Sequence, residues 1–155
     1  MRVSTKSDYA LRALIEIACR ESGGERKAIS AEELGRAQDI PHGFLQAILA
    51  DLRRSGIVVS QRGQSGGWRL ARAASDVSVA DVIRAVDGPL VSVYGLRPEA
   101  VSYSGNAEVL QRVWIAARSS LRDVFEAVSI AGLAEGELPE AVMEMTVDDD
   151  AWVSH

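Results

Sequence analysis

Five arginines gather in one stretch of the sequence that holds no acidic residue. The stretch runs from residue 52 to residue 75, and its arginines are Arg53, Arg54, Arg62, Arg69 and Arg72. Guanidinium groups bind phosphate through paired hydrogen bonds, and a stretch of one charge sign attracts a polyanion even when the whole chain is acidic. The net charge is −5, but residues 1–87 carry 13 basic and 11 acidic side chains while residues 88–155 carry 4 and 11. These residues therefore favour phosphate binding by the N-terminal half.

Residue types that support catalysis or metal binding are scarce. The 155 residues include one cysteine, Cys19, and two histidines, His42 and His155. The sequence contains no nucleophile motif, no phosphate-binding glycine loop followed by a helix, and no metal-ligand spacing. We therefore expect no enzyme activity, no metal and no cofactor. The 47% apolar content is typical of a folded globular protein, and no segment resembles a signal peptide or a membrane span. We expect a cytoplasmic protein without a membrane partner.

Three helices followed by a hairpin are predicted to position the arginines. Apolar residues recur at helical spacing over residues 7–21, and the glycines at positions 23 and 24 end that helix. Ser30 and Glu33 have the spacing of a capping box before a short helix over residues 31–37. Pro41 suits the first turn of a third helix that reaches Arg54, with Gly56 as its stop. Two helices joined by such a short turn predict a helix-turn-helix.

The segment after the third helix predicts a wing. Residues 57–60 and 68–71 have strand character, and the glycine-rich residues 63–67 form the turn between them. A fourth helix starts after Ser78 and stops at Gly88. The fold class is therefore mostly α with a small β-hairpin: a winged helix-turn-helix domain over residues 1–90 plus a long C-terminal dimerisation helix.

The C-terminal part divides into a linker, a long helix and a tail. Residues 91–105 lack periodicity, and residues 106–134 contain a helix over about 107–128. Its apolar residues are spaced as in a helix that packs on another long helix: Leu110, Trp114, Ala117, Leu121, Val124 and Val128. A second copy of the chain is the predicted partner, and packing on its own domain is the alternative. The acidic tail, residues 135–155, is expected to be mobile.

Several short motifs together resemble the Rrf2-type bacterial transcription regulators. They are residues 1–6, residues 9–13, the pair Phe44-Leu45, residues 52–58, the sequence RGQSGGWRL over residues 62–70, and residues 87–90. The resemblance is close over residues 1–90 and extends to the long helix by position. It implies a homodimer on double-stranded DNA that binds a pseudo-palindromic operator. The recognition helices would enter successive major grooves about 34 Å apart, with each wing along a minor groove.

Candidate DNA contacts follow from this arrangement. Arg62 fits a narrow minor groove, and Gln46 on the outer face of the third helix can pair with adenine. The others are expected at phosphates or at the start of the recognition helix: Ser4, Thr5, Lys6, His42, Gly43, Arg53, Gly63, Gly66 and Gly67. The alternative for Arg53, Arg54 and Arg72 is a solvated face without base contact. Trp68 is expected to pack the wing onto the body.

The sequence departs from this family in its sensory segment. Many relatives hold an iron–sulfur cluster on three cysteines of the linker, but residues 91–105 contain no cysteine or histidine. The sequence therefore resembles the cluster-free branch, and Asp8 is interpreted as a first-turn acid rather than a ligand. A small-anion effector pocket is one hypothesis, and loop aromatics that only cover the helix junction are the alternative. The residues concerned are Tyr94, Arg97, Tyr103 and Trp114.

Two further hypotheses concern regulation. Cys19 is expected to be a buried inert thiol, with an exposed thiol sensor as the alternative. The function that the residues favour is a homodimeric repressor. The alternative is a protein-interaction module whose winged fold docks a partner protein through the acidic half and controls or replaces DNA binding.

Overall fold

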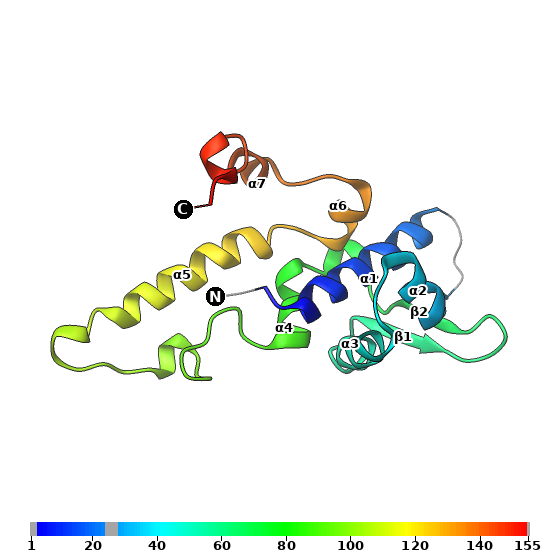
Figure 1. The fold of residues 1–155 in the computed structure, drawn as a ribbon, viewed down its shortest axis with the longest axis horizontal. Helices are drawn as coiled ribbons and strands as arrows, with labels where there is room; N and C mark the ends of the chain where they lie inside the picture. Colours follow the sequence, from blue (N-terminus) through cyan, green and yellow to red (C-terminus); the bar gives the residue numbers. More distant parts are fainter. Residues whose placement is uncertain (1–2, 24–27, 155) are drawn as a thin grey trace.

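A helical body that carries a hairpin at one end and a long helix at the other makes up the chain (Figure 1). The computed structural model describes residues 3–23 and 28–154, so the predicted helix stop at Gly24 lies outside the described residues. The helices are α1 Thr5–Ser22, α2 Ala31–Gln38, α3 His42–Arg54, α4 Val79–Asp87, α5 Leu110–Phe125, α6 Ile130–Glu135 and α7 Glu140–Glu144. Short 3-10 turns cover Ala74–Asp76, Pro98–Ala100, Gly105–Ala107 and Asp149–Trp152.

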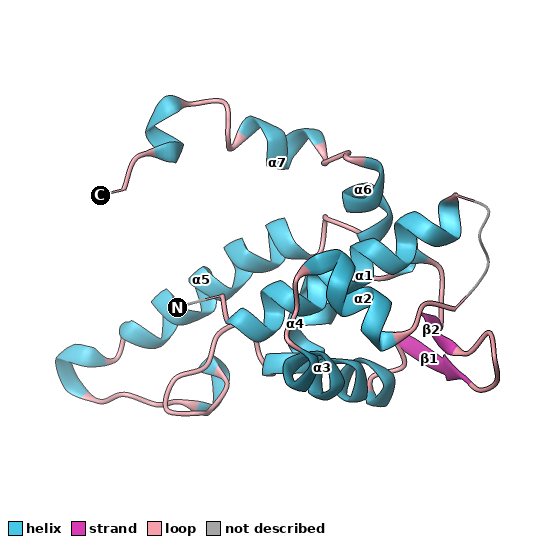
Figure 2. Ribbon diagram, turned by 45° about the vertical axis from the view of Figure 1, so that its right-hand side comes forward, coloured by secondary structure: helices cyan, strands magenta, loops and turns pink. Residues whose placement is uncertain are grey.

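The predicted wing is an antiparallel hairpin (Figure 2). Strand β1, Val58–Gln61, pairs with β2, Gly67–Leu70, and Ser60 lies opposite Trp68. Each strand begins or ends within one residue of its predicted bounds. The predicted fold class, a mostly helical winged helix-turn-helix chain, is confirmed.

The helix boundaries follow the predicted capping chemistry. The Ser30 side chain accepts from the Glu33 backbone N–H, and the Glu33 carboxylate accepts from the Ser30 backbone N–H. Ser78 caps α4 in the same way. Pro41 occupies the position before the first residue of α3 rather than its first turn. Gly56 follows α3 with φ +70°, a conformation that costs glycine little.

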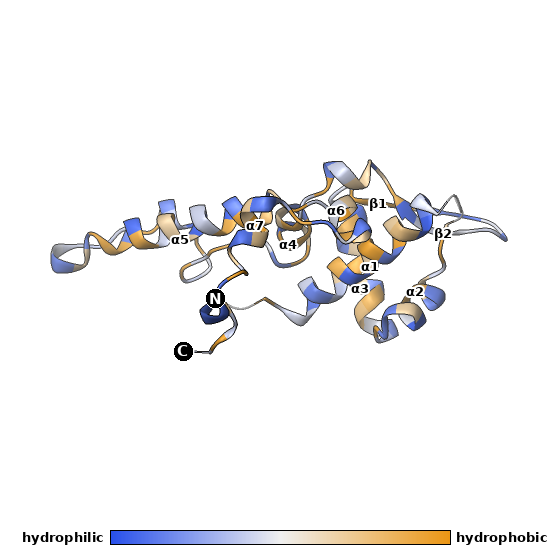
Figure 3. Ribbon diagram, turned by 90° about the horizontal axis from the view of Figure 1, so that it is seen from above, coloured by the Kyte–Doolittle hydropathy of each residue, from blue (hydrophilic) through white to orange (hydrophobic). Residues whose placement is uncertain are grey.

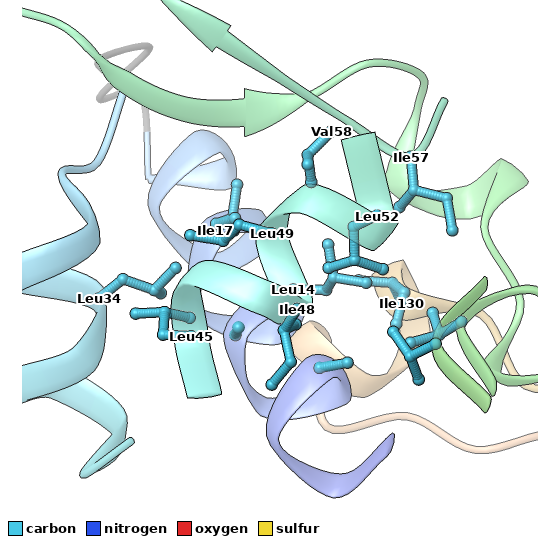
Figure 4. Packing of buried hydrophobic residues seen from close by; sticks show 14 of the residues in the cluster. Leu14, Ile17, Leu34, Leu45, Ile48, Leu49, Leu52, Ile57, Val58 and Ile130 are labelled. Carbon is cyan, nitrogen blue, oxygen red and sulfur yellow. The ribbon is translucent and has the colours of Figure 1, made fainter. Parts of the chain in front are cut away.

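The core sits where α1, α2 and α3 meet β1 and α4 (Figure 4). Its fully buried side chains recur at helical spacing on the inner faces: Leu14 and Ile17 on α1, Leu34 on α2, and Leu45, Ile48, Leu49 and Leu52 on α3. Because α3 buries one face completely, its opposite face is left to solvent.

The chain returns to this core after the long helix. Ile130 is fully buried among the residues of the N-terminal body, and its backbone N–H donates to the Val77 carbonyl at 2.9 Å. The Val79 N–H donates to the Val128 carbonyl at 2.9 Å. The long helix ends at Phe125, so Val128 is not on it; that side chain is buried within its own chain and cannot contribute to a seam on α5.

Helix α5 itself stands away from the body. No residue of α5 is buried, and hydrophobic and hydrophilic residues alternate along it (Figure 3). One side faces the linker: Gln111 donates to the Val101 carbonyl at 2.6 Å, and Arg118 pairs with Glu99. The tail beyond α6 is not irregular throughout, since α7 and the last 3-10 turn lie in it. No helix of the described residues combines the length and apolar character needed to cross a bilayer.

Candidate nucleic-acid interface

The outer face of α3 carries polar and small side chains that all face solvent. Four apolar residues of α3 are buried in the core, and Asp51 is half-buried. The other residues of the helix are exposed: His42, Gly43, Phe44, Gln46, Ala47, Ala50, Arg53 and Arg54. Gln46, Ala50 and Arg53 are spaced at four and three residues, so they lie on one face of the helix. With Arg54 and Trp68 they line a hollow of about 520 Å³ between α3 and the wing. A helix face of this kind fits a DNA major groove.

The five clustered arginines differ in whether a carboxylate pairs with them. Three form ion pairs: Arg54 with Asp51 at 2.9 Å, Arg69 with Glu21 at 3.8 Å, and Arg72 with Asp81 at 3.3 Å. Within residues 3–23 and 28–154, no carboxylate lies within ion-pair distance of Arg53 or Arg62. Both are exposed, Arg53 on the outer face of α3 and Arg62 at the wing turn. These two guanidinium groups are therefore the ones that remain available for a phosphate or a base.

Each glycine of the wing occupies a position that favours glycine for a different structural reason. Gly63 has φ +112°, and a Cβ there would meet nothing within 4 Å. At Gly66 a Cβ would lie 2.6 Å from the Gln61 carbonyl oxygen, because the turn is tight. At Gly67 it would lie 2.3 Å from the Ile29 carbonyl oxygen. Gly67 thus permits the paired hydrogen bonds between Ile29 and Trp68 that hold the wing to the body.

Two of the three residues expected to contact phosphate before α1 have partners inside the chain. Ser4 caps α1 by accepting from the Ser7 N–H at 2.9 Å, and its hydroxyl donates to Asp87. The Lys6 ammonium pairs with Asp51 on α3 and donates to the Val86 carbonyl at 3.0 Å. These contacts fix α1 against α3 and α4, and phosphate contact by Ser4 and Lys6 stays a prediction. Thr5 is exposed.

The charge on Asp51 is stabilised by this contact. The hydrogen bond from Lys6 lowers the pKa of the Asp51 carboxyl below its ordinary value, with a smaller contribution from the Arg54 charge. No local sequence pattern indicates this pair, because 45 residues separate Lys6 from Asp51.

Aromatic contacts hold the start of α3 against α1. The rings of Tyr9 and Phe44 meet edge to face with centroids 5.8 Å apart, and the Arg12 guanidinium lies 5.5 Å from the Tyr9 ring centroid. Arg12 also donates to the carbonyl of Gln38, the last residue of α2. These residues belong to the motifs that carry the family resemblance, but their contact with one another was not predicted.

The four residues of the predicted effector pocket do not come together. Tyr94 is 92% exposed and has φ +53°. The Trp114 indole donates to the Tyr103 hydroxyl at 3.1 Å, so these two cover the junction of the linker and α5. Arg97 instead lines a separate hollow with three other arginines, which is described below.

The donor set of the linker does not fit an iron–sulfur cluster. Residues 91–105 supply no thiolate and no imidazole, and Asp8 pairs with Arg12 at 3.5 Å. In the part of the chain that the structure describes, no three His, Cys, Asp or Glu side chains are grouped so as to hold a metal ion. The one thiol, Cys19, was expected to be buried, but it is exposed. Its Sγ lies 3.5 Å from the Ala134 carbonyl oxygen.

The apolar residues of α5 form a half-exposed strip. Its members are Leu110, Trp114, Ala117, Leu121 and Val124, and none is buried. Val109 and Val113 extend the strip on its open side and are 69% and 53% exposed. Trp114 and Ala117 also border an apolar hollow of about 690 Å³ with residues 89–93.

Comparisons with known proteins agree with this geometry. The sequence model of the Rrf2 family, described as iron-dependent transcriptional regulators, matches residues 3–136. A Mycobacterium tuberculosis protein named as an HTH-type transcriptional regulator is 42% identical over 148 residues, which cover 96% of this chain and 90% of that protein. The structure of CymR, the global cysteine regulator of Bacillus subtilis, has a TM-score of 0.71 at 25% identity and covers 88% of this chain and 98% of its own. The structure of T. potens IscR has a TM-score of 0.65 at 25% identity, and the match covers 100% of this chain and 93% of the IscR chain.

Proposed function

The chain belongs to the Rrf2 family of DNA-binding transcriptional regulators, and we propose that it is a homodimeric repressor that binds a pseudo-palindromic operator without an iron–sulfur cluster. One observation carries the proposal. Of the five clustered arginines, only Arg53 and Arg62 have no carboxylate partner among the described residues, and they lie on the two elements that a winged helix presents to DNA. A surface that serves only solubility has no need to keep these two guanidinium groups unpaired.

Each element of the interface has its own part in DNA recognition. The exposed face of α3 enters the major groove, where the Gln46 amide pairs with the N6 and N7 atoms of adenine. Arg53, about two turns further from the helix start, contacts a phosphate. Arg62 at the wing turn inserts into the adjacent minor groove, which is narrow and strongly negative in A/T-rich DNA. His42 and Gly43 place the start of α3 close to the DNA backbone.

The homodimer follows from the unpartnered apolar strip of α5. Val113 is 53% exposed, and Leu121 is only half-buried by its own chain. A helix with such a strip gains free energy when a second apolar helix covers it, and a two-fold axis lets the same strip on a second copy do so. The hollow beside Trp114 and Ala117 gives the partner helix a place to pack.

The proposal also includes repression of transcription and the absence of an iron–sulfur cluster. A dimer with two recognition helices and two wings covers a promoter and excludes the polymerase. The lack of thiolates and imidazoles in residues 91–105 supports a protein without a cluster, and a regulator of DNA acts in the bacterial cytoplasm. Iron and acid-labile sulfide assays on anaerobically purified protein test this point, and stoichiometric iron with sulfide would contradict it.

Selection of random duplex DNA by the purified protein, at two salt concentrations, tests the function. We expect an enriched two-fold motif with half-sites about one helical turn apart. Salt-sensitive binding without a motif would contradict sequence-specific recognition. No binding at either salt concentration would favour the protein-interaction module over the DNA-binding regulator.

A further inference from the structure

Four arginines from three separate segments converge on one hollow outside the DNA interface. The hollow has a volume of about 430 Å³ and lies between α4, the linker and α5. Its arginines are Arg84 on α4, Arg97 in the linker, and Arg118 and Arg122 on α5. Residues 88–155 contain only four basic side chains against 11 acidic ones, and three of those four line this hollow. Positive charge is thus concentrated at one place in the acidic half.

The carboxylates nearby do not balance these arginines. Glu126 is shared by Arg84 and by Arg122, whose nitrogens lie 3.0 and 3.2 Å from its two oxygens. Glu99 pairs with Arg118. Asp81 lies 3.8 Å from Arg84, but it also pairs with Arg72 and so adds no net charge.

Arg97 is the arginine of the hollow that forms no ion pair, although its charge helps to lower the pKa of Glu99. Its side chain forms no hydrogen bond or ion pair with the described residues. The four arginines and the two glutamates that contact them sum to a charge of +2, and Asp123, whose charge acts on Arg122, reduces the sum around the hollow to +1. The glutamates remain ionised at neutral pH. Hydrogen bonds from Arg122 and Arg84 lower the pKa of Glu126 to about 2, and hydrogen bonds from its own backbone N–H and from Arg118 lower the pKa of Glu99 below its ordinary value.

We propose that this hollow binds a compact anion with at least two negative charges on phosphate or carboxylate groups. Each guanidinium has five N–H donors in a planar fork, so donors remain on Arg84, Arg118 and Arg122 after their ion pairs are formed. The volume exceeds that of a single phosphate and is in the range of small-molecule sites. The wall formed by Gly88, Pro89 and Leu90 is uncharged and contacts the remainder of the ligand.

The position of the hollow gives the anion a regulatory effect, and this step rests on the proposed function. Arg84 belongs to the DNA-binding body, whereas Arg118 and Arg122 belong to the helix that is proposed to join two subunits. An anion that bridges them fixes the angle between α4 and α5. In a dimer that angle sets the distance between the two α3 helices, on which operator affinity depends.

Calorimetric titration of the full chain tests the site without DNA. The probes are pyrophosphate, which supplies phosphate groups, and citrate, which supplies carboxylates, each at constant ionic strength. We expect saturable binding of one anion per chain for at least one probe. Arg97→Gln should weaken it about tenfold or more, because a planar charged contact is lost. Arg112→Gln is the matched control: it removes the same charge from an exposed position on α5 outside the hollow and should leave the affinity within about twofold.

The outcomes separate the site from its proposed role. No saturable binding of either probe, or an equal loss in the Arg97→Gln and Arg112→Gln proteins, would overturn the site. Operator affinity is then measured with and without a saturating probe. A change in the wild type that Arg97→Gln abolishes supports the regulatory effect, and an unchanged affinity overturns that effect but not the site. A protein that binds the anion and no DNA refutes the proposed function alone.

Discussion

Removal of the Arg62 side chain is predicted to weaken DNA binding without weakening the fold. The guanidinium is exposed at the wing turn and contacts no carboxylate among the described residues. Arg62→Ala therefore deletes no intrachain ion pair, and its unfolding free energy should stay within about 0.5 kcal/mol of the wild type. Thermal unfolding of the two proteins checks this first, so that any loss of DNA binding is assigned to the interface.

The loss in DNA binding is expected to be about 1–3 kcal/mol, which corresponds to a fall in affinity of about 5- to 150-fold. The physical reason is a charged planar group that leaves the negative potential of a narrow minor groove. Fluorescence anisotropy with the selected operator measures the affinity. A second operator with G·C pairs under the wing should lose less affinity in the variant, because its minor groove is wider and holds the guanidinium less well.

Arg112→Ala is the matched control for this measurement. Arg112 lies on α5 and carries the same charge as Arg62. Helix α5 lies at the end of the molecule away from the hairpin (Figure 1). Its removal should change operator affinity by less than about twofold, because screening weakens a charge beyond a Debye length of about 10 Å. If Arg62→Ala keeps both affinity and sequence preference, or if Arg112→Ala loses as much affinity, the assignment of the wing to the minor groove is refuted.

Three further predictions concern the wing, the dimer and pH. Gly67→Ala should lower the unfolding free energy by about 2–4 kcal/mol, since the new Cβ would lie 2.3 Å from a backbone oxygen. In Gly43→Ala the Cβ would meet nothing within 4 Å and should not destabilise the fold, so equal unfolding free energies of the two variants in denaturant would contradict the prediction. Val113→Asp should leave the subunit folded but raise the dimer dissociation constant by about 100-fold or more in sedimentation, because it buries unpaired carboxylates at a two-fold contact, and an unchanged dimer would place the interface elsewhere. The Lys6 hydrogen bond lowers the pKa of Asp51, so the ion pair stabilises the fold above the ordinary carboxyl pKa and this stabilisation is lost as pH falls through the lowered pKa. The difference in unfolding free energy between wild type and Asp51→Asn should therefore shrink at acid pH, and a difference that is constant with pH would contradict the ion pair.

Local sequence patterns determined most of the secondary structure. The capping box at Ser30 and Glu33, the cap at Ser78 and the stop at Gly56 act within a few residues of each other, so their chemistry is visible in the sequence. The periodicity of α3 likewise separated its buried face from its exposed face. The predicted end of α5 was less accurate, because Val128 continues the apolar spacing although the chain has already left the helix.

The sequence also indicated which segment would bind DNA, but not which of its side chains are free of intrachain ion pairs. The arginine-rich, acid-free stretch is a property of composition. Asp51 pairs with Arg54 three residues away on the same helix, but packing brings Glu21 to Arg69 and Asp81 to Arg72. Lys6 and Ser4 are of residue types that commonly contact phosphate in protein–DNA interfaces. They lie against Asp51 and Asp87 only because α1 packs across α3 and α4.

Long-range packing alone decided three features. Ile130 enters a core built from residues at positions 10 to 86, because the chain turns back after α5. Gly67 is required by a backbone approach to Ile29 that no local turn pattern reveals. Arg84 and Arg97 are drawn to Arg118 and Arg122 by the packing of α5 on α4 and the linker. Helix propensity and capping depend on neighbours in sequence, and charge pairing and close approach depend on neighbours in space, which for this chain only the folded structure supplies.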